Sequence, residues 1–252
     1  MDQSAQYGQM DFNLPHDVVS LPSKGIFYKP KKESLKVGFL TASDENLLMS
    51  QNIPKEGLIT TLLKNKIYEP GFDVTQMIDV DVQAVLLFLR NTAFGPEYNY
   101  IITDPATNKK FDVTLNIDEV NYLPSIHKSD IDGFFSTVLP KSNVNLKCKV
   151  LSVKESNEID SIQNSYPDNM IAPVMTKRLE SQIVELNGER DKGKIAQFVN
   201  QMPISDSKYL RKYLRECEPK LDLLRTITAP SGEKVAVEVT FGAEFFRPFF
   251  SV

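Results

Sequence analysis

The sequence predicts an α+β fold in which short antiparallel β-hairpins pack against several helices. Three observations lead to this prediction. Segments with apolar residues three and four positions apart indicate amphipathic helices, and two pairs of strand-like segments flank proline-containing turns, as hairpins do. One constant shift of the chain also pairs a helix and hairpin in the first half with a helix and hairpin in the second half. We therefore expect two related helix–hairpin units.

The composition is that of a globular protein with a sizeable core. Of 252 residues, 41% are hydrophobic and 25% are charged, and the net charge of −4 gives no general attraction to nucleic acid or anionic lipid. The longest strongly apolar run, Ala84–Leu89, is far shorter than the about 20 residues of a membrane helix. Met1–Met10 lacks the apolar core of a signal peptide. Because the two cysteines lie far apart in the chain, we expect a reducing, cytoplasmic setting.

The first segments are expected to be extended. Residues 1–13 read as a flexible polar arm. Pro22–Gly25 has the residue types of a turn, and it leads into a short strand at Ile26–Tyr28. A second strand, expected at Leu35–Leu40, pairs nearby.

Three helices are expected next. Ser43 caps a helix whose first residues are acidic, as the positive end of a helix favours. Gly57–Lys66 carries its leucines and isoleucine along one face and forms a second helix. The third opens at Asp79 or Asp81 and ends near Arg90, because its valines and leucines keep helical spacing.

A hairpin and two further elements complete the first half. Tyr98–Thr103 and Phe111–Ile117 are strand-like, and Asp104–Asn108 supplies the turn between them. Asp130–Leu139 is expected to be helical and to stop at the following proline. Val144–Val150 alternates apolar and polar residues, which predicts a half-buried strand.

The best candidate for a linker is the polar, proline-containing segment 157–169. It would separate an α+β lobe at 14–156 from a lobe of helices and a hairpin at 170–252. Pro173 near the start of the second lobe suits the first turn of a helix. The elements expected there are a long helix with an apolar stripe from Ile171 to Leu186, short helices at Ile195–Met202 and Asp206–Glu216, and a hairpin within Arg225–Val239.

The constant shift that relates the two halves pairs residues at corresponding places in each unit. Asp81 meets Asp206 at a helix start, and Pro105 meets Pro230 in a hairpin turn. The match weakens after the turn, and the paired residues are common types. An internal duplication and a chance agreement therefore both remain open.

No pattern of catalytic, cofactor-binding or metal-ligating residues stands out, and we predict a protein that is not an enzyme. Gly188–Ile195 approaches the spacing of a phosphate-binding loop, but it lacks the final Ser or Thr and is expected to follow a helix rather than a strand. A polar turn is the preferred interpretation. The four soft ligands, His16, His127, Cys148 and Cys217, show no metal-ligand spacing.

Two surface features could contact a partner. Lys208, Arg211, Lys212 and Arg215 form a basic stripe on one helix, which would suit an acidic partner or phosphates, although a solvated face is the preferred interpretation. The aromatic segment Phe245–Phe250 either closes the core or presents an apolar patch, and closure of the core is preferred. The basic stripe together with the ribbon-like hairpins would also suit a nucleic-acid-binding module, which is not expected because the chain is acidic overall.

Four motifs resemble the T4-like bacteriophage baseplate protein family. They are Leu21–Gly25 (LPSKG), Leu40–Glu45 (LTASDE), Phe198–Pro203 (FVNQMP) and Phe245–Pro248 (FFRP), in that order along almost the whole chain. Length and motifs are most similar to family members that assemble the central hub of the baseplate.

The resemblance implies an assembly factor that acts, without catalysis, on other baseplate hub proteins in the host bacterial cytoplasm. A structural hub subunit retained in the virion is the alternative. Neither a cofactor nor a membrane partner is implied. The candidate partner-binding residues are Leu21, Pro22, Ser23, Lys24, Gly25, Lys208, Arg211, Lys212, Arg215, Phe245, Phe246, Arg247, Pro248, Phe249 and Phe250.

The resemblance also implies that the two hairpins are degenerate zinc ribbons. Family relatives often carry Cys-Pro-x-Cys at the hairpin turns. Here the turns read Asp104-Pro-Ala-Thr107 and Ala229-Pro-Ser-Gly232, so the prolines are present and the thiols are not. Without thiol ligands, no structural zinc is expected, and packing and turn chemistry must hold the hairpins.

Overall fold

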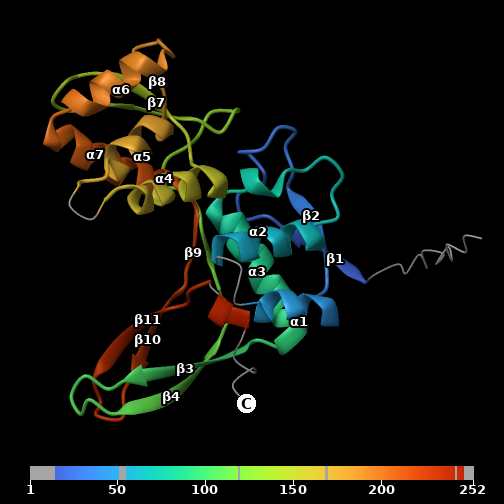
Figure 1. Cartoon of the computed structure of the whole chain (residues 1–252). Coiled ribbons are helices and arrows are strands. Elements are labelled where there is room, and N and C mark those ends of the chain that lie inside the picture. Colours follow the sequence, from blue (N-terminus) through green and yellow to red (C-terminus); the bar gives the residue numbers. More distant parts are fainter. Residues whose placement is uncertain (1–14, 51–54, 119, 168–169, 242, 247–252) are drawn as a thin grey trace, which may run out of the picture.

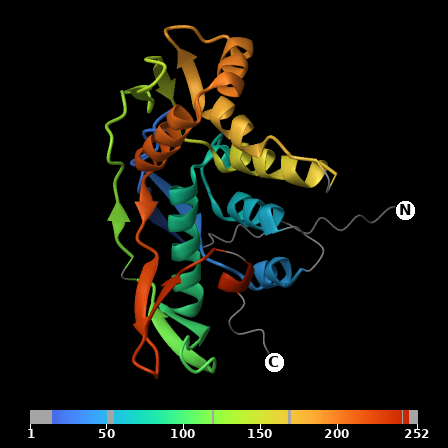
Figure 2. The same cartoon turned by 90° about the vertical axis from the view of Figure 1, so that its left-hand side faces the viewer.

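The computed structural model describes residues 15–50, 55–118, 120–167, 170–241 and 243–246. It confirms an α+β fold, with helices and several small antiparallel sheets. The chain forms two lobes and a projecting arm of hairpins (Figure 1). The second lobe and the arm lie at opposite ends of the molecule, with the first lobe between them (Figure 2). None of the described helices is long and apolar enough to cross a membrane.

The first lobe packs helices on one small hairpin. Its strands β1 (His16–Ser20) and β2 (Ser34–Gly38) pair in antiparallel register. Its core contains Leu35 and Val37 of β2 and the apolar face of the longest helix. The helical elements of this lobe are α1 (Ala42–Met49), α2 (Lys55–Lys66), the 3-10 turn η1 (Val74–Gln76) and α3 (Asp79–Phe94).

The arm consists of two hairpins that pack face to face. Alternate residues such as Tyr100, Val113, Ile227 and Val237 are partly buried and join the core of the first lobe. The Tyr100 hydroxyl donates a hydrogen bond to the Glu238 carbonyl across the two hairpins. The arm's strands are β3 (Glu97–Thr103), β4 (Lys110–Asn116), β10 (Leu224–Thr228) and β11 (Lys234–Glu238).

The second lobe has its own core around a three-stranded sheet in the order β6-β7-β8. Leu139, Leu146, Leu179 and Leu210 are buried together in it. Its elements are β6 (Phe135–Val138), β7 (Asn145–Cys148), α4 (Val153–Ser165), α5 (Val174–Gln182), β8 (Ile183–Leu186), α6 (Lys192–Gln201) and α7 (Ile204–Cys217).

The chain enters and leaves the second lobe through a narrow two-stranded ribbon. Strand β5 (Tyr122–Leu123) pairs with β9 (Lys220–Leu221), and the chain then runs back through the arm to the 3-10 turn η2 (Ala243–Phe246). Four late residues, Leu223, Val239, Phe245 and Phe246, belong to the same core cluster as the first lobe. The C-terminal segment therefore completes the N-terminal lobe, so the expected units 14–156 and 170–252 do not correspond to the two cores.

The first expected strand is wrong. Ile26–Tyr28 lies in a series of turns, and β2 pairs instead with His16–Ser20. Gly25 has φ +66°, and a Cβ there would come within 1.9 Å of the Lys32 carbonyl oxygen, so the turn needs glycine. The next helix begins two residues earlier than expected, because Thr41 rather than Ser43 is its N-cap.

The helix expected at Asp130–Leu139 is also wrong. The Asp130 carboxylate accepts hydrogen bonds from the backbone N–H groups of Asp132 and Phe134, which makes a tight turn. Strand β6 follows, and its residues alternate between buried and exposed. The residue types do not show this alternation, because polar Thr137 is buried and apolar Val138 is 47% exposed, so pairing with β7 rather than a local pattern makes the strand.

The expected linker at 157–169 lies largely within helix α4. This helix has a capping box in which Ser152 and Glu155 exchange hydrogen bonds, and Ile159 is its one fully buried residue. The long helix expected from Ile171 to Leu186 is shorter as well. It ends at Gln182, because Ile183–Leu186 pairs with β7.

The remaining expectations are confirmed within a few residues. The helices at Gly57–Lys66, Ile195–Met202 and Asp206–Glu216 correspond to α2, α6 and α7. The turn residues Asp104–Asn108 connect β3 and β4, and the second hairpin runs from Leu224 to Glu238, one residue off the expected Arg225–Val239 at each end. The expected arm at 1–13 lies outside the described residues.

Candidate functional site

The Leu21–Gly25 loop is held inside the first lobe by hydrogen bonds to Asp81 of α3. Leu21, Ser23 and Gly25 are buried, whereas Lys24 is exposed. The Asp81 carboxylate of α3 accepts three hydrogen bonds, from the Ser23 N–H (2.9 Å), the Ser23 hydroxyl (2.5 Å) and the Tyr28 hydroxyl (2.6 Å). These contacts give the loop a role within the fold. The expectation that Leu21, Pro22, Ser23, Lys24 and Gly25 contact a partner stays a prediction, and among them only Lys24 is exposed.

The second lobe repeats this anchor. Asp206, at the same position of α7 as Asp81 in α3, accepts hydrogen bonds from the N–H groups of Lys141 (2.8 Å) and Ser142 (2.9 Å). These donors follow a Leu-Pro pair, Leu139-Pro140, just as Ser23 follows Leu21-Pro22. Each lobe therefore ties a Leu-Pro loop to the start of a helix through a buried aspartate.

Further matching features support duplication over chance. Both lobes place this loop between two antiparallel strands, and both place a capping box after the second strand, at Thr41–Asp44 and at Ser152–Glu155. The helices α3 and α7 then each lead to a hairpin of the arm.

The two buried aspartates differ in their electrostatics. Burial raises the pKa of Asp81, and its hydroxyl and N–H donors offset this only in part. Burial would also raise the pKa of Asp206, but the backbone N–H donors of Lys141 and Ser142 outweigh it, so the pKa lies below its usual value. Asp206 is thus held as a carboxylate, whereas Asp81 more readily takes up a proton.

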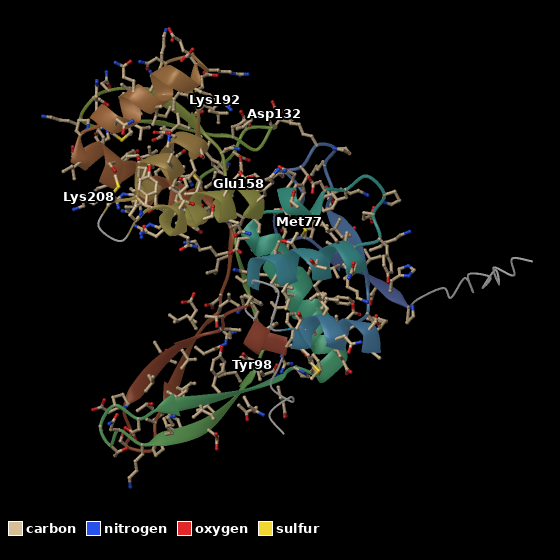
Figure 3. All side chains as sticks on the ribbon, viewed as in Figure 1. Met77, Tyr98, Asp132, Glu158, Lys192 and Lys208 are labelled. Atoms are coloured by element: carbon tan, nitrogen blue, oxygen red, sulfur yellow. The ribbon has the colours of Figure 1, made fainter. Side chains whose placement is uncertain are left out.

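Phe245 and Phe246 are fully buried, which confirms the interpretation that they close the core. Phe245 packs on Tyr98 and lies 5.7 Å from the guanidinium of Arg90, which is itself fully buried. Figure 3 shows Tyr98 beside η2. Arg90 donates hydrogen bonds to the carbonyls of Gly95 and Glu97 where the arm begins. Arg247, Pro248, Phe249 and Phe250 lie outside the described residues.

The two hairpin turns of the arm meet through Asp104. Its carboxylate accepts hydrogen bonds from the Ser231 hydroxyl (2.8 Å) and the Ser231 N–H (3.1 Å), and also from the Ala106 N–H in its own turn. Such hydrogen bonds are the turn chemistry expected to hold the hairpins. Within the described residues, no three His, Cys, Asp or Glu side chains group as a metal site would.

The basic residues of the α7 stripe do not all face the same surroundings. Lys208, Arg211 and Arg215 line a groove of about 450 Å³ between α5 and α7, which we name the basic groove. Lys212 does not line it and instead lies 3.8 Å from Glu216 on its own helix. Figure 3 shows Lys208 at the outer edge of the second lobe, away from Met77 in the first lobe.

Helix α5 supplies the opposite wall of the basic groove. Its residues Met175, Arg178, Leu179 and Gln182 recur at helical spacing and line the groove, together with Leu214 of α7. The sequence did not indicate Arg178 as a groove residue, because Met175 and Leu179 read as part of the apolar stripe of one long helix. The one carboxylate in the lining is Glu218, whose pKa is raised by burial.

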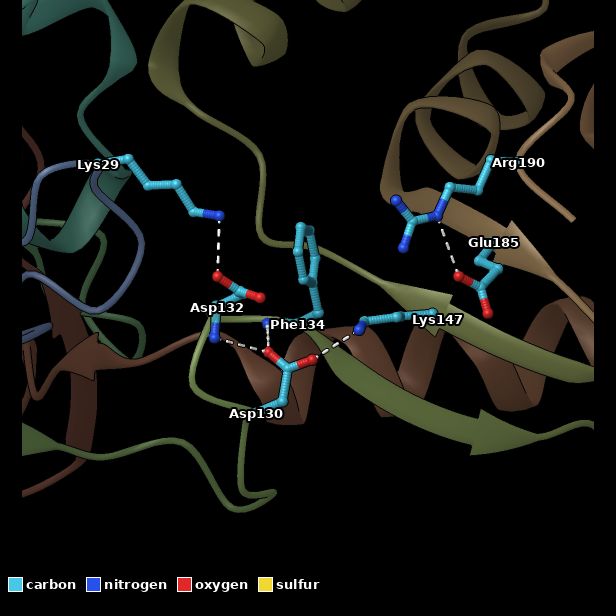
Figure 4. Close-up of polar contacts among 7 residues, drawn as sticks. All are labelled: Lys29, Asp130, Asp132, Phe134, Lys147, Glu185 and Arg190. Atoms are coloured by element: carbon cyan, nitrogen blue, oxygen red, sulfur yellow. Dashed lines mark hydrogen bonds and ion pairs between the residues drawn. The ribbon is translucent and has the colours of Figure 1, made fainter. Parts of the chain in front are cut away.

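A second cavity, of about 500 Å³, lies where the two lobes meet. Phe27, Phe72 and Phe134 line it, and its charged residues are paired across its mouth, with Lys29 lying 2.8 Å from Asp132. Figure 4 shows this pair and, below it, the ion pair between Asp130 and Lys147. Because these charges are balanced, the cavity offers no strong preference for a charged ligand.

The two cysteines, His127 and the segment Gly188–Ile195 make contacts within the fold. Cys148 and Cys217 are buried free thiols, and burial raises the pKa of each to about 12. His127 lies 2.9 Å from Glu216. The segment Gly188–Ile195 follows strand β8, not the expected helix, which removes one objection to a phosphate loop. Ion pairs occupy this turn, one from Arg190 to Glu185 and one from Lys194 to Glu189 (Figure 4 shows the first).

Comparison with known proteins gives one match. A family model described as "T4 bacteriophage base plate protein" matches residues 18–247, almost the whole chain. No curated protein and no solved structure matches the chain.

Proposed function

The chain belongs to the T4 bacteriophage base plate protein family, and we propose that it is an assembly factor that binds other proteins of the baseplate hub without catalysing a reaction. The family match over residues 18–247 is the observation that carries this proposal. The match covers both lobes and the arm, so it applies to the whole architecture and not to one part of it.

The surface supports a role in protein contacts. Several large apolar side chains stand almost fully in solvent, among them Ile131 (98% exposed), Ile171 (96%) and Ile204 (79%). Exposing such side chains costs free energy that an interface recovers. The projecting arm also presents Ile101 and Leu224 on its outer faces, at 70% and 57% exposure.

An assembly factor must bind its partners and later release them. It favours the conformation of a partner that is ready to assemble by binding that conformation better. Release requires interfaces of modest area, and small exposed patches and grooves suit this better than one broad apolar face. The alternative is a structural subunit of the hub that stays in the virion.

Mass spectrometry of purified phage tails separates these two roles. For an assembly factor we expect the chain to be absent from finished tails while baseplate hub proteins co-purify with the tagged chain from infected cells. Its presence in tails in a fixed ratio to known subunits would favour the structural subunit. Failure to recover any baseplate protein from infected cells would reject both.

A further inference from the structure

We propose that the basic groove between α5 and α7 binds a short segment of another baseplate protein in which acidic side chains flank one or two apolar side chains. This inference rests on the proposed function and assigns it a surface and a partner chemistry.

The charge of the groove is the first argument. Lys208, Arg211 and Arg215 form no ion pair within the part of the chain that the structure describes. Arg178 on the opposite wall is paired with Asp160 at 2.7 Å, and that carboxylate is well exposed. Because the chain as a whole carries a net charge of −4, this local excess of cations is a departure from the general surface. Carboxylates of a partner would complement it.

The floor of the groove is the second argument. Leu179 and Leu214 lie beneath the cations, with exposures of 3% and 4%, and Met175 at the rim is 48% exposed. Ile171, almost fully exposed, lies in the segment that leads into α5. An apolar floor between charged rims fits one face of an amphipathic peptide segment.

The same features disfavour nucleic acid. Phosphates would satisfy the cations, but bases need aromatic side chains or donors and acceptors placed for their edges. Of the described residues that line the groove, none is aromatic, and the floor between the cations is leucine. A flexible methionine at the rim adapts to apolar partners.

The size of the groove limits the occupant. A volume of about 450 Å³ holds a few side chains and not a folded domain. The partner therefore inserts a short segment, and the resulting interface is modest, as reversible binding requires.

Lys212 provides a matched control on the same helix. It follows Arg211 directly and is 73% exposed, yet it faces away from the groove. Reversing its charge changes the net charge of the protein as much as reversing Lys208 or Arg211 does. An effect specific to the groove must therefore appear when Lys208 or Arg211 is reversed and be absent when Lys212 is reversed.

The first experiment measures binding to a labelled peptide of about 12 residues, in which pairs of Glu alternate with pairs of Leu, by fluorescence anisotropy with the full chain. We expect the single variants K208E and R211E each to weaken binding at least about fivefold, and K212E to change it less than about twofold. A peptide with Lys in place of Glu should not bind. Equal effects of the groove variants and K212E, or equal groove-dependent binding of a short DNA duplex, would overturn the proposal.

The second experiment identifies the natural occupant. A photo-crosslinking amino acid at Met175, and at Lys192 on α6 as control, is introduced into the tagged full chain in infected cells. We expect Met175 to crosslink to an acidic, partly apolar segment of another baseplate protein. Crosslinks to nucleic acid or to a second copy of this chain would overturn the inference.

The two proposals fail differently in this experiment. If baseplate proteins co-purify with the tagged chain but no crosslink forms at Met175, the groove assignment is wrong and the assembly role stands. If neither co-purification nor crosslinking occurs, the assembly role itself is rejected. Thermal unfolding of each variant checks that its fold is intact.

Discussion

The two buried aspartate anchors allow a sharp comparison of one substitution at two related places. Asp206→Asn and Asp81→Asn both replace a carboxylate oxygen by an amide NH₂ group. At Asp206 the partners are two backbone N–H groups, which cannot turn round to accept a hydrogen bond. At Asp81 two of the three partners are hydroxyls, of Ser23 and Tyr28, which can accept as well as donate.

The expected cost follows from these partners. At Asp206 the amide loses one charge-assisted hydrogen bond, worth about 1.5–3 kcal/mol, and sets a buried donor against a donor, which costs about 1–3 kcal/mol. We therefore expect Asp206→Asn to lower the free energy of unfolding by about 3 kcal/mol. For a chain of this size that lowers the melting temperature by roughly 6–12 °C. Asp81→Asn should cost only about 1 kcal/mol, because its hydroxyl partners can reorient.

The assay is urea unfolding and thermal unfolding followed by circular dichroism, since the chain has no tryptophan to report by fluorescence. The control is Asp160→Asn, an exposed aspartate on α4. A loss of stability at Asp81 equal to or greater than that at Asp206 would refute the reasoning that the donor type decides the cost.

Three further outcomes follow from the same structure. The pKa of Asp206 is lowered in the folded protein, so the stability that its carboxylate contributes is present above the unfolded pKa of about 4 and is lost as the pH falls through the folded pKa. Urea titrations from about pH 6 to about pH 3 should therefore show a steeper loss of unfolding free energy for the wild type than for Asp206→Asn. Equal dependence of the two proteins on pH would contradict this. Arg90→Lys should lower the free energy of unfolding by about 2 kcal/mol, because one ammonium nitrogen would replace two guanidinium nitrogens that each donate to a different carbonyl oxygen in a buried site. A calorimetric loss under about 0.5 kcal/mol would contradict this. Asp104→Ala should speed amide hydrogen exchange at both hairpin turns, because Ser231 loses its partner; unchanged exchange at the second turn would show that the turns are not coupled.

Sequence periodicity predicted the helices and hairpins whose apolar faces are regular. The helix at Gly57–Lys66 and both hairpins of the arm are examples, because local pattern and tertiary burial agree there. Where burial is decided by a distant partner, the prediction was wrong. Ile183–Leu186 continues a helical stripe, yet it becomes a strand because β7 offers it an edge.

The duplicated anchor was only half visible in the sequence. The shift that pairs Asp81 with Asp206 does not pair Leu21 with Leu139, because Asp81 lies 60 positions after Leu21 (81 − 21) and Asp206 lies 67 positions after Leu139 (206 − 139). The second lobe places more chain, including β8, between its second strand and its helix α7. A search at one constant shift therefore finds the helices and hairpins and misses the loops that bind them.

The candidate site was predicted in part. Helical spacing predicted that Lys208, Arg211 and Arg215 share one face of a helix. It could not predict which other helix faces them across a groove. Arg178 and Met175 join the groove through the packing of α5 beside α7, which no local pattern specifies. The Leu21–Gly25 motif was predicted as a partner contact from the family resemblance, and no pattern in the sequence showed that Asp81 would accept hydrogen bonds from Ser23 of this turn.

The return of the chain through β9 to Phe245 and Phe246 affects the order of events during synthesis. The ribosome makes the helices of the first lobe early, but the aromatic residues that seal its core come only after the whole second lobe has been translated. The second lobe can thus fold cotranslationally as a unit while the first still waits, a reversal of the usual N-terminal-first order. Until translation reaches Phe246, the nascent first lobe exposes apolar surface that its late-made aromatic residues later cover.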